Sequence, residues 1–157
     1  MLAIKKPHTA IPINLRVTHE LRSVRRLEAA WQRGVEELER GLTEVSDGGR
    51  GEYVRILALG EFIRRTLRTL LNTKLWWTLR MRLKKSPSGK GAGKILVEMR
   101  TVAKDEIKNA EGTVKVLTKD SRLGWEPTMW YLTDRARLVW KTKLLRLVLT
   151  RDLAKSR

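Results

Sequence analysis

The sequence predicts a mainly α-helical protein with a small β-hairpin. Long segments repeat apolar residues every three or four positions, two short segments alternate apolar and polar residues, and Gly, Pro and Ser separate the segments. A length of 157 residues is enough for one core with an appendage. We therefore expect an arm over 1–16, a long helix over 17–47, a core over 52–134 and a basic C-terminal helix over 135–157.

The charge of the chain indicates an anionic partner. Thirty-four Lys and Arg stand against seventeen Asp and Glu, a net charge of +17. Residues 53–94 hold eleven basic residues and one acidic residue, and residues 135–157 hold eight and one. We expect nucleic acid, and double-stranded DNA first, because phosphate backbones recruit Lys and Arg. A membrane is not expected, because the basic segments are not cleanly two-faced and no long apolar run is present.

Composition argues against an enzyme. There is no cysteine, and His8 and His19 are the only histidines, so thiol chemistry and a histidine-based metal site have little to draw on. We expect no cofactor, no metal and no small-molecule substrate. The start of the chain lacks the apolar stretch of a signal peptide, which favours a cytoplasmic, nucleoid-associated protein. One Gln, three Asn and abundant charge are compatible with a thermophile.

Residues 1–47 predict an arm followed by a helix. Residues 1–16 contain two lysines and two prolines without helical spacing, so they form either an extended arm that follows DNA or a frayed terminus. From Val17 to Val45 the apolar residues form a narrow seam, which packs either on its own domain or on a second copy in antiparallel fashion. The glycines of residues 46–51 predict the end of this helix.

Residues 52–85 predict two helices with a break near residues 71–73. Apolar residues lie on two sides, which indicates a helix between layers or in an interface. Arg64, Arg65 and Arg68 lie opposite one apolar strip and are candidates for phosphate contacts.

Residues 86–111 predict a flexible loop and then a helix that faces DNA. The loop over 86–94 lacks the first Gly and the Ser or Thr of a phosphate-binding loop, so its amides, Lys90 and Lys94 are expected to meet DNA phosphates. On the following helix Lys94, Thr101, Lys104 and Lys108 face outward, either as a reading surface or as a solvated face.

Residues 112–157 predict a hairpin and a basic helix. Val114 and Val116 alternate with polar residues, a turn over 120–127 carries Arg122 and Trp125 at its tip, and a second strand covers 128–132. The C-terminal helix has two apolar lines, so we expect it in a subunit interface or buried between other helices.

The stretch from Glu111 to Arg137, with its Leu-Thr-Asp-Arg-Ala-Arg exit, resembles the winged helix-turn-helix family over roughly residues 52–140. The resemblance implies a dimeric binder of double-stranded DNA, either a transcription regulator or a chromatin-like architectural protein. It implies Lys94, Thr101, Lys104 and Lys108 in the groove and Arg122 on the wing. Because most of the positive charge lies on flanking helices, we expect phosphate contacts to dominate.

Two alternatives remain open from sequence. The chain is similar in size, charge and helix content to the coat subunits of filamentous archaeal viruses, which wrap nucleic acid, and this alternative places it in a virion. In the second alternative, the chain is an RNA-binding component of a ribonucleoprotein. The full set of candidate nucleic-acid-binding residues is Arg64, Arg65, Arg68, Lys90, Lys94, Thr101, Lys104, Lys108, Arg122 and Trp125.

Overall fold

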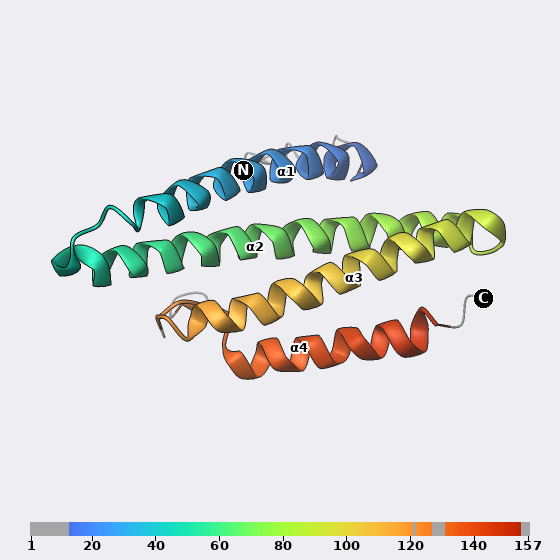
Figure 1. The fold of residues 1–157 in the computed structure, drawn as a ribbon. Helices are drawn as coiled ribbons and strands as arrows, with labels where there is room; N and C mark the ends of the chain where they lie inside the picture. The colour runs from blue at the N-terminus through green and yellow to red at the C-terminus, as the bar shows by residue number, and fades with distance from the viewer. Residues whose placement is uncertain (1–12, 121, 127–130, 155–157) are drawn as a thin grey trace, which may run out of the picture.

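The described part of the chain folds into four α-helices and a very short strand pair (Figure 1). The computed structural model describes residues 13–120, 122–126 and 131–154. In order, the elements are α1 (Ile13–Gly41), α2 (Asp47–Lys85), α3 (Gly89–Leu117), β1 (Trp125–Glu126), β2 (Tyr131–Leu132), α4 (Arg135–Leu147) and a π-helical turn, η2 (Val148–Asp152).

Successive helices run antiparallel, and each packs mainly on its neighbour in sequence (Figure 1). The long hairpin of α2 and α3 is central, α1 packs on α2, and α4 packs on α3. The arrangement is therefore open, and much of the molecular surface is contributed by the sides of helices that have no neighbour.

Two apolar clusters hold the helices together. Leu21 and Val24 of α1 meet Leu71 of α2. The second cluster joins α2, α3 and the C-terminal turn and consists of Leu79, Ile95, Met99 and Leu153. The apolar seam of α1 therefore packs against α2 of the same chain. Of the two arrangements that the sequence allowed for this helix, the structure shows packing within its own domain.

Short polar segments end the helices. Ser46 and Ser88 are extended residues at the starts of α2 and α3, and Gly89 has a φ of +79°, a backbone conformation that favours glycine. At the start of α4, the Asp134 side chain accepts a hydrogen bond from the Arg137 backbone N–H at 2.7 Å.

The expected winged helix-turn-helix core is wrong. Residues 114–118 were expected as a strand, but α3 continues through Gly112 to Leu117. The strands among the described residues are β1 and β2, which pair antiparallel through two residues each and are too short for a wing. Residues 127–130 of the expected turn and second strand, like residues 1–12 of the expected arm, lie outside the described residues. The fold is therefore helical throughout its core.

Gly112 shows why α3 does not end where the sequence suggested. A side chain at this position would collide with the Arg65 guanidinium, which crosses from α2. The glycine therefore makes room for a neighbouring side chain and does not stop the helix. The spacing of Ile107, Ala110, Val114 and Leu117 is also helical, so the short alternation in this segment was ambiguous.

Other boundaries also differ. Helix α1 begins at Ile13, inside the arm expected over residues 1–16. The expected break at residues 71–73 is absent from α2, and Leu71 and Asn72 are buried there. The glycines of residues 46–51 begin α2 after α1 has already ended at Gly41. The loop expected over 86–94 is a turn of three residues, because α3 begins at Gly89. None of the helices described is long and apolar enough to cross a membrane.

Candidate nucleic-acid interface

One side of α3 faces solvent along its whole length. Its residues recur at intervals of three and four, as one face of a helix requires, and all of them are exposed: Lys90, Lys94, Val97, Thr101, Lys104, Lys108, Glu111 and Lys115. We call these eight residues the α3 lysine face. Four of the candidates from sequence, Lys94, Thr101, Lys104 and Lys108, share this face with Lys90, as the apolar spacing predicted.

The carboxylates of α3 are all paired with cations from neighbouring helices. The pairs are Arg82–Glu98 at 3.1 Å, Arg68–Asp105 at 2.7 Å, Arg146–Glu111 at 2.6 Å and Lys141–Glu106. In the part of the chain that the structure describes, the five lysines of the α3 lysine face form no ion pair. The four acidic residues of α3 therefore do not offset its lysines, because cations of α2 and α4 neutralise them and leave the lysines available.

A groove beside this face gathers the three candidate arginines of α2. It lies between α1, α2 and α3 and has a cavity volume of about 350 Å³. Its lining consists of Glu28, Arg64, Arg65, Arg68, Asp105, Lys108 and Asn109. The structure thus brings together residues that are more than forty positions apart in sequence, with Lys108 shared between the groove and the α3 lysine face.

The arginines in this groove are already held by carboxylates. Arg64 donates two hydrogen bonds to Glu61, at 2.6 and 2.7 Å, and Arg65 lies 2.7 Å from the same carboxylate. Burial alone would raise the pKa of Glu61, but the hydrogen bonds and charges of both arginines outweigh it, so the pKa is lowered. Because these guanidinium groups are occupied, the groove is a weaker site for an anion than the α3 lysine face.

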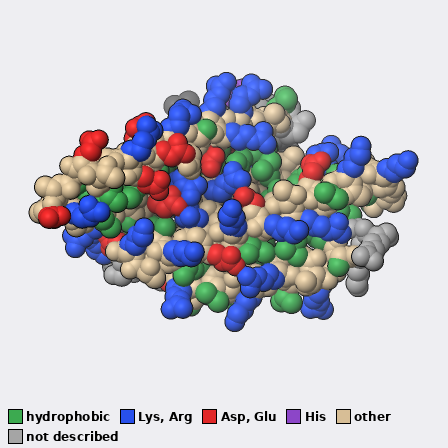
Figure 2. Space-filling view, in the orientation of Figure 1, with side chains coloured by type: hydrophobic (Ala, Val, Ile, Leu, Met, Phe, Trp, Pro, Cys, Tyr) green, Lys and Arg blue, Asp and Glu red, His purple; other side chains and the backbone are tan. Residues whose placement is uncertain are grey.

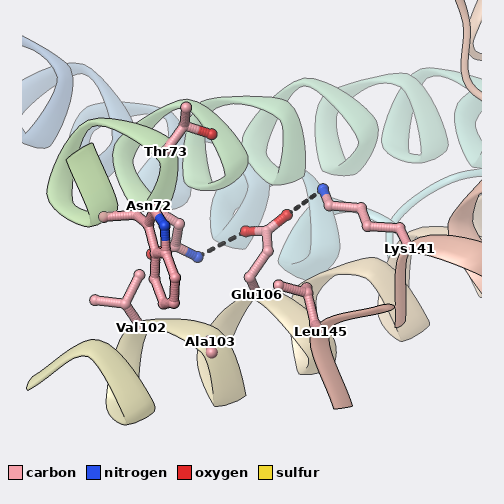
Figure 3. Close-up of a pocket in the computed structure, with 8 residues that line it drawn as sticks. Asn72, Thr73, Val102, Ala103, Glu106, Lys141 and Leu145 are labelled. Atoms are coloured by element: carbon pink, nitrogen blue, oxygen red, sulfur yellow. Dashed lines mark hydrogen bonds and ion pairs between the residues drawn. The ribbon is translucent and has the colours of Figure 1, made fainter. Parts of the chain in front are cut away.

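A row of polar side chains links α2, α3 and α4 (Figure 3). Asn72 donates to both Asp105 and Glu106, at 2.7 Å each, and Glu106 also pairs with Lys141 of α4. Thr69 donates to Glu106 at 2.7 Å. Glu106 is only 6% exposed, so these donors are what allow its charge to be buried.

An apolar pocket of about 200 Å³ adjoins this row, with walls that include Trp76, Val102 and Leu145. In Figure 3, Glu106 points between Asn72 and Lys141 and is satisfied by them. The arrangement fixes α4 against the α2–α3 hairpin and offers no unoccupied acid, base or nucleophile. We therefore assign this pocket a structural role.

The remaining candidates lie apart from the α3 lysine face. Arg122 follows α3 and binds Asp120 through its side chain, at 2.7 and 2.9 Å, and through its backbone N–H at 3.0 Å. These hydrogen bonds lower the pKa of Asp120 to about 2. Trp125 belongs to β1, and the Arg122 side chain is exposed but follows α3 directly and lies on no wing.

Sequence reasoning selected only Lys90 and Lys94 from a basic region at the end of the α2–α3 hairpin and missed the part that α2 contributes. Residues 80–94 contain six Lys and Arg and no Asp or Glu, and all six are exposed. Arg80, Lys84 and Lys85 were not among the candidates, although the absence of acidic residues over fifteen positions was a visible signal. In Figure 2 basic side chains dominate this end of the molecule, whereas acidic side chains gather toward the opposite end.

Among the described residues, no group of three or more His, Asp or Glu side chains could hold a metal ion. Comparisons with protein-family models, with curated proteins and with solved structures find no match for this chain.

Proposed function

We propose that this protein binds double-stranded nucleic acid, DNA in the first place, through contacts between the α3 lysine face and the phosphate backbone. The observation that carries the proposal is the pairing of every carboxylate of α3 with another helix, while five lysines on its exposed side have no ion pair within the described residues. A strip of unpaired lysines on a chain of net charge +17 attracts a polyanion over a long range.

The dimensions of the strip suit a duplex. Lys90 and Lys115 are 25 residues apart, which corresponds to about 37 Å along a helix. One turn of B-DNA rises about 34 Å, so a strip laid along one side of a duplex spans about one turn of it.

The position of α3 favours backbone contacts over base reading. Helices α2 and α4 pack along α3, so a single strip of its surface is open to a partner. A reading helix must enter the major groove deeply enough for its side chains to reach base edges. Contacts between lysines and phosphates fix the position of the protein without reading the bases, so the binding we propose is largely independent of sequence.

The test is a titration of labelled duplex DNA over a series of salt concentrations. Each phosphate that is neutralised adds about −0.9 to the slope of log K against log salt. The variant Lys104→Ala/Lys108→Ala is expected to weaken binding and to reduce the magnitude of this slope by about 1.8. Both positions are exposed and helical, and Ala is a good helix former, so circular dichroism is expected to be unchanged.

A matched control removes the same charge elsewhere. Arg26 and Arg33 are exposed on α1, and Arg26→Ala/Arg33→Ala lowers the net charge equally. We expect this variant to change the slope much less than the lysine variant does. Equal changes from both variants, or no salt-dependent binding by the wild-type chain, would refute the proposal. Stronger binding to double-stranded RNA of the same length would redirect it to an RNA partner.

A further inference from the structure

A second face of the molecule is apolar, and no helix among the described residues packs on it. Along the outer side of α2, ten residues recur at intervals of three and four: Glu52, Ile56, Leu59, Ile63, Thr66, Leu70, Thr73, Trp77, Arg80 and Lys84. Ile56 and Leu59 are each 47% exposed and Leu70 is 41% exposed, while Ile63 and Trp77 are half-buried. We call this row the α2 outer seam.

The α2 outer seam is distinct from the surfaces that α2 uses inside the molecule. Leu71 packs on α1, and Leu79 packs on α3. The seam falls on the remaining side, and from Ile56 to Trp77 it extends about 31 Å along the helix. An exposed apolar row of this length on a soluble helix usually marks a contact surface.

From this row we infer that the α2 outer seam pairs with the same seam of a second copy of the chain, with the two helices antiparallel. The spacing is that of a two-helix seam, in which residues three and four apart interlock with those of the facing helix. In the antiparallel register about a two-fold axis near residue 68, Thr66 lies opposite Leu70 of the second copy, and Leu59 opposite its Trp77.

Charge selects this orientation. The same register places Glu52, near the start of α2, opposite Lys84 of the second copy, near its end. Lys84 is exposed and has no ion pair among the described residues, and the present partner of Glu52 is Arg55 at 3.3 Å on the surface, a weak contact. A two-fold axis forms the Glu52–Lys84 contact twice, whereas a parallel pair would place Glu52 beside Glu52 and Lys84 beside Lys84.

The exposed row on α4 does not offer the same opportunity. Trp140, Leu144 and Leu147 are 65%, 44% and 50% exposed, but Lys143 and Arg151 flank them without ion pairs in the described part of the chain. Two copies paired through this row would bring their cations together. The α4 row therefore supplies a control surface of similar apolar character.

The test measures the mass of the full chain by light scattering over a range of concentrations. We expect a dimer for the wild type and a monomer for Leu59→Gln/Leu70→Gln, whose positions are exposed and whose fold should be unaffected. The control Leu144→Gln/Leu147→Gln is expected to remain a dimer. A monomeric wild type, or a double variant of α2 that still forms dimers, would overturn the inference.

The orientation is tested separately by exchanging charges. Glu52→Lys alone and Lys84→Glu alone are each expected to weaken the dimer, because each places like charges together. The two changes combined restore opposite charges at both contacts and are expected to restore the dimer. Failure of the combined variant to recover would rule out the antiparallel register. None of the substituted positions on α2 belongs to the α3 lysine face. Duplex binding by the monomeric variant Leu59→Gln/Leu70→Gln can therefore be measured independently of dimer formation.

Discussion

Arg68 of α2 holds Asp105 of α3 through two hydrogen bonds, from Nε at 2.7 Å and from Nη2 at 2.9 Å. The bidentate pair spans the central hairpin and lies at one end of the polar row that continues through Asn72 to Glu106. Asp105 belongs to the helix that carries the lysine face, so its pairing affects both the stability of the hairpin and the charge of the interface.

This pair makes stability depend on pH. The hydrogen bonds from Arg68 lower the pKa of Asp105 in the folded chain. A lowered folded-state pKa contributes stability above the unfolded pKa of about 3.9, and this contribution is lost as the pH falls through the folded-state value. Asp105→Asn is therefore expected to lower the melting temperature at neutral pH, with a difference from wild type that shrinks in acid. Glu44→Gln, at an exposed position, is expected to show no such difference.

The buried carboxylate of Glu106 depends on Lys141. Lys141→Ala removes its charged partner while Thr69 and Asn72 still donate to it. We expect a loss of about 1–3 kcal/mol in the free energy of unfolding, measured in urea, because a buried acceptor loses a charged donor. Lys143→Ala removes an exposed lysine from the same helix and is expected to change stability by no more than about 0.5 kcal/mol. Equal effects would show that the ion pair contributes nothing.

Trp31 attaches α1 to α2 at a glycine. Its indole N–H donates to the carbonyl oxygen of Gly60 at 2.7 Å, and Gly60 lies close to Val35 and Leu38 of α1. Trp31→Phe is expected to lower the free energy of unfolding by about 1 kcal/mol or more through the lost hydrogen bond and packing. Trp140→Phe, at a position 65% exposed on α4, is the control and is expected to leave thermal unfolding unchanged.

Two glycines at the start of α3 should respond in opposite ways to alanine. Gly89 has a φ of +79°, so Gly89→Ala is expected to destabilise the chain by about 1 kcal/mol through backbone strain. Gly91 lies within the helix with open space around it, and Gly91→Ala is expected to stabilise by up to about 1 kcal/mol. Chemical denaturation of the two variants measures both signs, and the same sign for both would contradict this account of the turn.

Apolar spacing located the helices but not their ends. The exposed positions of Lys94, Thr101, Lys104 and Lys108 follow from spacing alone, because a helix of known phase fixes which residues face away from its core. The sequence could not predict that helix α2 continues through Asn72, because a buried Asn is tolerated only where neighbouring groups complete its hydrogen bonds. Those acceptors, Asp105 and Glu106, are more than thirty positions away.

The electrostatics of the interface were also hidden in the sequence. A count of charges along α3 gives six basic and four acidic residues, and only the fold reveals that Arg82, Arg68, Lys141 and Arg146 pair with the acids. The role of Gly112 was hidden for a similar reason, because its neighbour Arg65 belongs to another helix and is far away in the sequence. Local patterns carry no information about such partners.

The attachment of α4 has a thermodynamic consequence for whatever binds α3. Lys141 and Arg146 of α4 neutralise Glu106 and Glu111, so detachment of α4 would expose two negative charges beside the lysines. A polyanion seated on α3 would therefore favour the attached form, and by linkage it would slow local opening of α4. Amide hydrogen exchange in α4, a helix that the ligand need not touch, would then report occupancy of its neighbour.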